Sequence, residues 1–186
     1  MTYAEQIKQM VRSVSFEKMN FPYPVTNLSL VECPNPTDLV YGSFIAHILV
    51  AGAPFKLTFR VHFKCSEIRD LIANFREIPR DRITDAFAMD LMKEFCNLVA
   101  GGIKRIFIDQ KIACGIALPC LNKGVDEILY KSMKSVTAQN DIWSLRWDLG
   151  AVTCVSSLEV FDLTKIEGLS FDQATALSID DDDPFL

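Results

Sequence analysis

A glutamate and an asparagine, Glu94 and Asn97, stand three residues apart in a segment whose apolar residues recur at helical spacing. Residues three apart lie about one turn apart on the same face of a helix, so the two side chains are expected to be neighbours. They offer a carboxylate next to a neutral amide that can both donate and accept hydrogen bonds. The small residues Ala100 and Gly101 follow, and they would let the backbone of another molecule come close. The pair is therefore a candidate contact site for a polar partner.

The helix that must position this pair is expected over residues 84–107, with Thr84 as its N-cap and Asp85 well placed for the helix dipole. One apolar stripe is expected to face the core: Ala88, Leu91, Met92, Phe95, Leu98, Val99, Gly102, Ile103 and Ile106. The opposite face is expected to carry Asp90, Lys93, Glu94, Asn97, Ala100, Gly101 and Lys104. Two consecutive glycines cost about 1 kcal/mol each relative to alanine in a helix. We therefore expect compensation, through close packing at Gly102 or close docking of a partner at Gly101.

An exposed acid and amide are ordinary on a helix, and the pair taken alone favours a plain solvated face. The same spacing occurs at Glu17 and Asn20, near the end of the first expected helix, where Phe21 and Pro22 follow at once. Asn20 is therefore expected to be a helix C-terminal residue rather than part of a second site. Cys96 points well around the helix from Asn97 and has no histidine near it in sequence, so we do not expect a thiol nucleophile.

The other elements follow from periodicity and turn signals. A first helix is expected over residues 3–19, and extended segments over 28–32, 39–50 and 55–63. The last of these alternates apolar and polar residues as a half-buried antiparallel strand does, and residues 51–54 make a hairpin turn before it. A short helix is expected to be capped by Ser66. A strand over 112–118, a helical piece over 125–133 and a closing hairpin of residues 142–147 and 151–161 complete an α+β fold.

At the long helix the sequence resembles the CheC/CheX family of chemotaxis phosphatases, whose signature is a helical Glu-x-x-Asn followed by a hydrophobic residue, Ala-Gly and a nearby Lys. The matching residues here are Glu94, Asn97, Leu98, Ala100, Gly101 and Lys104. The similarity continues into a strand that ends in Leu118-Pro119 and into the final hairpin, and it covers residues 1–163. It is specific over the helix and the Leu-Pro strand. The single motif at this position is more similar to CheX than to CheC, which carries two.

The resemblance implies a two-layer fold, with an antiparallel sheet packed against helices, in a CheX-like domain of residues 1–163. It implies hydrolysis of the aspartyl phosphate of a CheY-type response regulator, with Asn97 orienting the water and Glu94 contacting a lysine of the partner. Ala100, Gly101 and Lys104 would line the docking surface. A neutral amide suits a reaction that demands positioning more than deprotonation. The Mg²⁺ would belong to the regulator, so no cofactor or metal of its own is expected for this chain.

Two alternatives stay open at this point. A non-catalytic, CheC-like binding module for a receiver domain, or for a flagellar or signalling partner, is favoured by the single motif, by Cys96 inside it and by the carboxy-terminal extension. A purely structural dimer is the third interpretation. CheX-like proteins pair through their sheets, so a homodimer is possible, and Trp143 and Trp147 are expected in the core or at such an interface.

Composition sets wider bounds. The chain has 186 residues, of which 49% are hydrophobic and 23% charged, as expected for one globular domain. The longest apolar stretch, residues 44–55, is interrupted and is shorter than the ~20 residues of a membrane span, and residues 1–14 are amphipathic rather than a signal sequence. A cytoplasmic protein without membrane contact is therefore expected. The net charge of −5 comes mostly from residues 180–183, and without a basic strip nucleic-acid binding is not expected.

The remaining reactive residues have simpler interpretations. The six cysteines form no CxxC pair and are expected to be free thiols. His47 and His62 match no metal-binding pattern and are expected to be structural. Residues 164–186 are interpreted as a flexible extension with an acidic tail, or alternatively as a docking peptide anchored by Phe185 and Leu186.

Overall fold

The computed structural model of this chain describes residues 2–20, 25–32, 42–124, 139–167 and 169. In chain order the elements are α1 (Tyr3–Met19), β1 (Ser29–Glu32), β2 (Phe44–Gly52), β3 (Phe55–Phe63), α2 (Cys65–Arg76), the short 3-10 helix η2 (Arg80–Arg82), α3 (Asp85–Asp109), β4 (Cys114–Ile116), β5 (Cys120–Lys123), β6 (Gln139–Trp147), β7 (Gly150–Val160) and the 3-10 helix η3 (Leu163–Lys165). None of the described helices is both long and apolar enough to cross a membrane.

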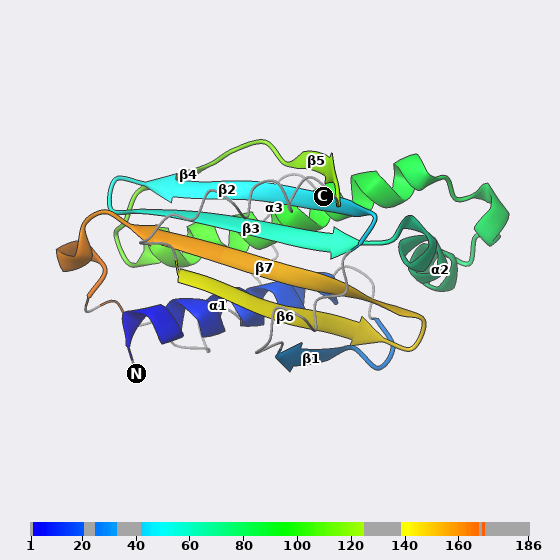
Figure 1. The fold of residues 1–186 in the computed structure, drawn as a ribbon, viewed down its shortest axis with the longest axis horizontal. Helices are drawn as coiled ribbons and strands as arrows, with labels where there is room; N and C mark the ends of the chain where they lie inside the picture. The colour runs from blue at the N-terminus through cyan, green and yellow to red at the C-terminus, as the bar shows by residue number, and fades with distance from the viewer. Residues whose placement is uncertain (1, 21–24, 33–41, 125–138, 168, 170–186) are drawn as a thin grey trace.

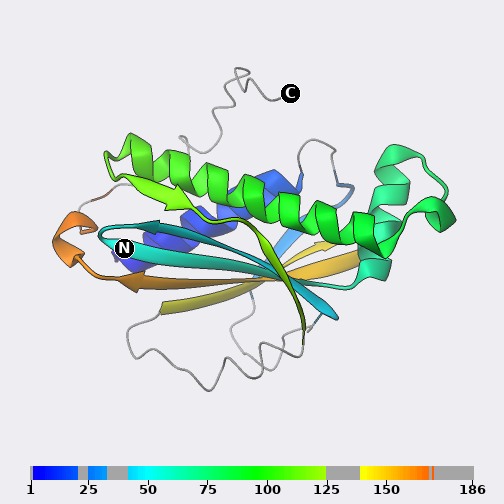
Figure 2. The same ribbon diagram turned by 90° about the horizontal axis from the view of Figure 1, so that it is seen from above.

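The strands form one seven-stranded sheet in the order β1-β6-β7-β3-β2-β4, and β5 also pairs with β2. Neighbouring strands run antiparallel throughout. Helices α1 and α3 lie side by side across one face of the sheet, and α2 stands at one end of it (Figures 1 and 2). The predicted α+β fold, with an antiparallel sheet packed against helices, is confirmed.

Strand β3, at the centre of the sheet, carries the alternation that the sequence predicts. Its side chains on the helix-covered face are all buried: Phe55, Leu57, Phe59, Val61 and Phe63. Two of these rings meet α3, because Phe59 lies 5.9 Å from Phe95 edge to face and Phe55 stacks on Phe107 at 4.1 Å, both measured between ring centroids. Aromatic pairs at such distances add packing energy beyond the area they bury. They hold one face of α3 against the sheet, so the opposite face points outward.

Polar contacts fix α1 over the other half of the sheet. The guanidinium of Arg12 donates two hydrogen bonds of 2.7 Å to the carboxylate of Asp141 on β6 and also pairs with Glu32 on β1. The hydrogen bonds to Asp141 raise the pKa of Arg12, so the guanidinium keeps its charge. One turn further along α1, the hydroxyl of Ser15 accepts a hydrogen bond of 3.1 Å from the indole of the buried Trp143. These contacts hold α1 over β1 and β6.

Several predicted boundaries differ from the structure. Helix α2 has Lys64 at its N-cap position and no side-chain cap, so the predicted cap at Ser66 is wrong. The helix starts directly after β3, and there Lys64 pairs with Glu67 at 2.9 Å while Glu67 also accepts a hydrogen bond from the backbone of Ala151. The contact between Glu67 and Ala151 therefore ties the uncapped start of α2 to β7.

The segment expected as one strand over residues 112–118 is shorter, and β4 and β5 pair with different parts of β2. The helical piece expected over 125–133 and the beginning of the segment expected over 39–50 lie outside the described residues, as does most of the extension over 164–186. Within its described part, Ile166 is fully buried in the same core. Core packing therefore continues slightly past residue 163.

Candidate functional site

Helix α3 begins where the sequence predicts. Thr84 is its N-cap, and the Thr84 hydroxyl accepts a hydrogen bond of 3.2 Å from the backbone of Phe87. The helix has 25 residues and runs along the sheet (Figure 2). Glu94 and Asn97 are both exposed, as the periodicity predicts. Within the described parts of the chain, neither side chain is engaged in a hydrogen bond or an ion pair. An acid and an amide therefore stand together in solvent at the middle of a rigid helix.

The two glycines of α3 serve different purposes. A Cβ atom at Gly102 would lie 2.8 Å from Cγ1 of Val14, so the glycine lets α1 and α3 approach closely. A Cβ atom at Gly101 would meet nothing within 4 Å. Packing therefore accounts for Gly102 and leaves the cost of Gly101 without an explanation inside the described structure. Gly101 lies on the exposed side of α3 with Glu94 and Asn97. Lys104, one turn beyond Gly101, is half-buried.

Ala100 is a correction to the sequence prediction. It was expected on the outward face, but it is fully buried. Successive residues turn by about 100° around a helix, so Ala100 lies well around α3 from Gly101. Helix α3 contacts α1, β2 and β3, and Ala100 belongs to the hydrophobic core that they share. Ala100 therefore cannot touch a partner directly, and of the three expected docking residues Gly101 and Lys104 retain exposed surface.

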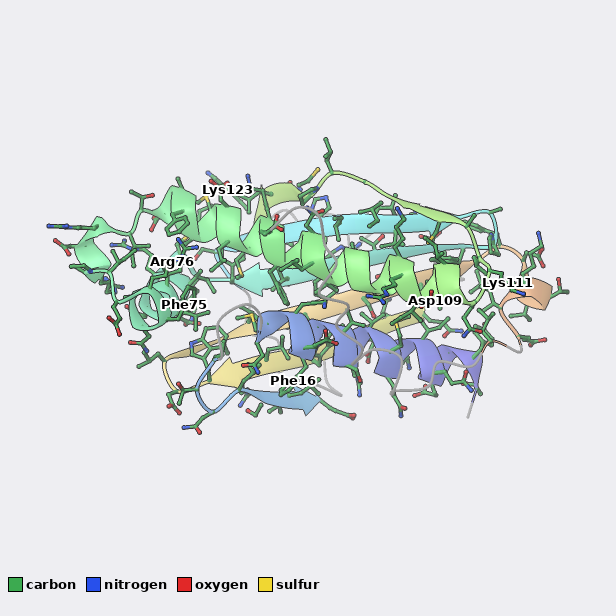
Figure 3. The ribbon with its side chains drawn as sticks, turned by 180° about the vertical axis from the view of Figure 1, so that it is seen from behind. Phe16, Phe75, Arg76, Asp109, Lys111 and Lys123 are labelled. Atoms are coloured by element: carbon green, nitrogen blue, oxygen red, sulfur yellow. The ribbon has the colours of Figure 1, made fainter. Side chains whose placement is uncertain are left out.

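An apolar cavity of about 210 Å³ opens beside Glu94, between α2, α3 and the end of α1. Glu94 lines it together with Leu91 and Leu98 of α3 and Phe75 of α2. The sequence predicts Leu91 and Leu98 in the core stripe, yet both are only half-buried because they face this cavity. Figure 3 shows Phe75 and Arg76 at the end of α2, next to α3. The sequence carries no periodic signal for such a cavity, because it depends on where α2 sits.

Two cations also border this cavity. Lys18 of α1 and Arg76 of α2 both line it. The ammonium group of Lys18 lies 2.7 Å from the carboxylate of Glu17, and the guanidinium carbon of Arg76 lies 5.1 Å from the ring centroid of Phe87. The cavity is thus apolar inside, with one acid and two bases among its lining residues.

The second Glu-x-x-Asn pair has a different environment. The side chain of Glu17 is 19% exposed and pairs with Lys18. Asn20 is the C-cap residue of α1, and its side-chain oxygen accepts a hydrogen bond of 2.8 Å from the backbone of Val25. The prediction that Asn20 serves as a helix C-terminal residue is confirmed.

Cys96 is fully buried on the core side of α3, and burial raises the pKa of its thiol far above the usual value. A raised pKa leaves little thiolate at neutral pH, so Cys96 is a poor nucleophile. Among the described residues, no three His, Cys, Asp or Glu side chains gather where they could hold a metal ion. Trp143, His62 and Trp147 are buried, which agrees with the core alternative for the two tryptophans.

No protein-family model and no curated protein matches this sequence. Several solved structures nevertheless share its fold. The chemotaxis protein CheX from Vibrio vulnificus has 17% sequence identity and a TM-score of 0.61, and the match covers 86% of this chain and 99% of that one. A CheC-like superfamily protein from Shewanella sp. PV-4 has 17% identity and a TM-score of 0.56, with coverage of 84% and 97%.

A chain of the CheX–CheY–BeF3–Mg²⁺ complex from Borrelia burgdorferi has 10% identity and a TM-score of 0.58, with coverage of 84% and 97%. At these identities the likeness concerns the fold. The resemblance that the Glu-x-x-Asn helix predicts is therefore confirmed as a CheC/CheX-like fold over most of the chain.

Proposed function

We propose that this chain is a CheX-like phosphatase that hydrolyses the aspartyl phosphate of a CheY-type response regulator. The observation that carries the proposal is the position of Asn97: exposed on the middle of α3, one turn from the exposed Glu94 and beside the open space at Gly101. The fold supports it, since a chain with a similar fold occurs in a complex of CheX and CheY with BeF3 and Mg²⁺.

In this proposal α3 lies against the partner so that the carboxamide of Asn97 reaches the phosphoryl group. The amide accepts a hydrogen bond from a water molecule and holds it in line with the bond between phosphorus and the aspartate oxygen. The water oxygen bonds to phosphorus, the bond to the aspartate oxygen breaks, and inorganic phosphate leaves while the water proton passes to a phosphate oxygen. Phosphoryl transfer goes through a loose transition state that needs positioning and charge stabilisation, so a neutral amide is sufficient.

Glu94 would act in recognition, with its carboxylate pairing with a lysine of the regulator. Gly101 would let the partner's backbone approach, and Lys104 would contribute a positive charge at the edge of the contact. The Mg²⁺ that neutralises the phosphoryl group would be held by the regulator's own carboxylates. Such a role places the chain in the cytoplasm with its partner.

Phosphate release from a phosphorylated receiver domain tests the proposal. The probes are the CheY-type receiver domains encoded in the same genome, each phosphorylated with a small-molecule phosphodonor. Wild-type chain should accelerate phosphate release from at least one of them, and Asn97→Ala should not. The matched control is Asn20→Ala, which removes the same amide from the engaged pair and should leave the acceleration unchanged.

The outcomes separate the alternatives. If wild type and Asn97→Ala both bind a receiver and neither accelerates phosphate release, the chain is a binding module and the phosphatase proposal is wrong. If the chain binds no receiver domain, the proposal that its partner is a receiver domain is wrong. A homodimer stays a prediction, which light scattering on the purified chain would check.

A further inference from the structure

We propose that the apolar cavity beside Glu94 receives one apolar side chain of the receiver domain, of about the size of leucine, methionine or phenylalanine. This inference rests on the proposed function and deepens it. It assigns to this chain a second contact that selects the partner, next to the residues that handle the phosphoryl group.

The first argument is continuity. Glu94 belongs to the exposed side of α3 with Asn97, and it also lines the cavity. A partner held over Glu94 and Asn97 therefore lies next to the cavity. The cavity lies on the flank of α3 that faces α1 and α2, so the partner would touch α3 and an apolar depression beside it in a single contact.

The second argument is size. The cavity has a volume of about 210 Å³, and its apolar lining comes from Leu71, Phe75, Leu91 and Leu98 among others. An apolar cavity of ~150 Å³ is large enough to bind benzene. One leucine, methionine or phenylalanine side chain therefore fits, whereas a whole helix does not. A single anchor in a desolvated pocket is the usual form of an interface hot spot.

The third argument is charge. Lys18 and Arg76 line the cavity, and Lys18 is partly neutralised by Glu17 at 2.7 Å. A phosphorylated receiver domain carries a phosphoryl group and the carboxylates that hold its Mg²⁺, so the surface around its phosphoaspartate is acidic. Cations next to an apolar pocket complement an apolar anchor that stands beside such an acidic surface. The same pattern gives no advantage to a basic partner.

The experiment fills the cavity from α3. Leu91→Trp adds bulk at a half-buried position that lines the cavity. The matched control is Leu163→Trp on η3, where the leucine is 42% exposed. The short helix η3 (Leu163–Lys165), drawn in orange in Figure 1, lies at the opposite end of the sheet from α2. Both variants are titrated with the receiver domain that wild type binds best, loaded with beryllofluoride and Mg²⁺.

Leu91→Trp is expected to weaken receiver binding by roughly 10-fold to 100-fold, because the displaced anchor loses its buried apolar contact. KM for the phosphorylated receiver should rise by a similar factor while kcat stays within about twofold, since Asn97 is untouched. Leu163→Trp should bind as wild type does. Unchanged affinity and KM in a folded Leu91→Trp protein would overturn the cavity assignment.

A second measurement covers the case in which Leu91→Trp fails to fold. Leu91→Ala is combined with alanine substitutions of the apolar surface residues next to the receiver's phosphoaspartate, in double-mutant cycles. One receiver residue should couple with Leu91, so that its loss weakens binding to wild type about tenfold and to Leu91→Ala much less. If no receiver residue couples with Leu91, the assignment is wrong.

Failure of the inference differs from failure of the proposed function. A wild-type chain that neither binds nor dephosphorylates any receiver refutes the proposed function. A wild-type chain that does both, together with an equally active Leu91→Trp, refutes the cavity assignment alone.

Discussion

Two Glu-x-x-Asn pairs in this chain have the same spacing and opposite environments. Glu17 and Asn20, at the end of α1, are engaged by their own chain, the first by Lys18 at 2.7 Å and the second by the backbone of Val25 at 2.8 Å. Glu94 and Asn97, in the middle of α3, are exposed and contact no described polar partner. An amide that already binds the backbone of its own chain stabilises the fold, whereas an amide held in solvent by a helix can serve another molecule.

The position of each asparagine in its helix explains why one side chain is engaged and the other makes no hydrogen bond with the described residues. Past the end of a helix the chain has backbone N–H groups without a helical partner, and the side-chain oxygen of Asn20 accepts a hydrogen bond from one of them, that of Val25. A residue in the helix interior has no such groups nearby, so its side chain stays available. The position of the pair within its helix, rather than its spacing, separates the structural pair from the candidate functional one.

The largest expected effect is that of Asn97→Ala on catalysis. We expect the acceleration of receiver dephosphorylation to fall by about 100-fold or more, because loss of a positioning group costs that much in comparable reactions. The free energy of unfolding should change by less than about 0.5 kcal/mol, since the side chain is exposed. Phosphate release and urea denaturation measure the two quantities. If Asn97→Ala lowered the free energy of unfolding and left catalysis unchanged, Asn97 would be a structural residue and the proposed catalytic role would be wrong.

The glycines of α3 give the next largest effect. Gly102→Ala should lower the free energy of unfolding by about 1–3 kcal/mol, because its Cβ would lie 2.8 Å from Val14 and the β-branched side chain cannot turn away easily. Gly101→Ala should raise it by up to about 1 kcal/mol, because its Cβ meets nothing within 4 Å and alanine favours the helix. Denaturant unfolding of both variants measures the difference.

Receiver titrations with Gly101→Ala complete this test. If the partner's backbone approaches α3 at Gly101, the stabilised variant should bind the receiver more weakly than wild type. Binding as tight as that of wild type would show that Gly101 is not part of the contact.

Glu94→Gln should weaken receiver binding by about tenfold, or about 1.4 kcal/mol, since the side chain loses the charge that pairs with the partner's lysine. The loss should shrink at high salt, which screens exposed charges. Glu17→Gln makes the same change in the engaged pair and should not weaken binding, because Glu17 pairs with Lys18 of its own chain rather than with the partner. Titrations at low and high salt measure both effects, and equal losses in the two variants would remove the distinction between the pairs.

Asn20→Ala should have the smallest effect, a loss of about 1 kcal/mol in the free energy of unfolding, because the hydrogen bond to the backbone of Val25 disappears. Phosphate release from the receiver should not change. We thus expect Asn97→Ala to reduce catalysis without affecting stability, and Asn20→Ala to reduce stability without affecting catalysis. Reduced catalysis by a fully folded Asn20→Ala protein would point to a second active pair.

Much of the fold follows from short-range patterns. The alternation in residues 55–63 predicts β3 with its correct bounds, because a strand between two environments needs apolar side chains on one face only. Thr84 predicts the start of α3, because its hydroxyl satisfies a backbone group three residues away. The exposure of Glu94 and Asn97 follows from the same helical period.

The features that the sequence misses all depend on neighbours that are distant in the chain. The helical period gives only an angle around α3, so it predicts Ala100 outward, whereas the packing of α3 in the shared core buries it. Leu91 and Leu98 were placed in the core, but the positions of α1 and α2 leave a cavity in front of them. Ser66 looks like a cap, but α2 starts earlier because it continues directly from β3.

The sequence by itself determined which helix carries the acid and the amide, and which of its faces is too polar to bury. These properties depend on residues within a few turns of one another, where helical geometry is regular. Only the tertiary structure decided that α1 approaches at Gly102, that Gly101 stays open and that an apolar cavity adjoins Glu94. Those features result from the packing of three helices on one sheet, and packing depends on the shapes of all the side chains that meet there.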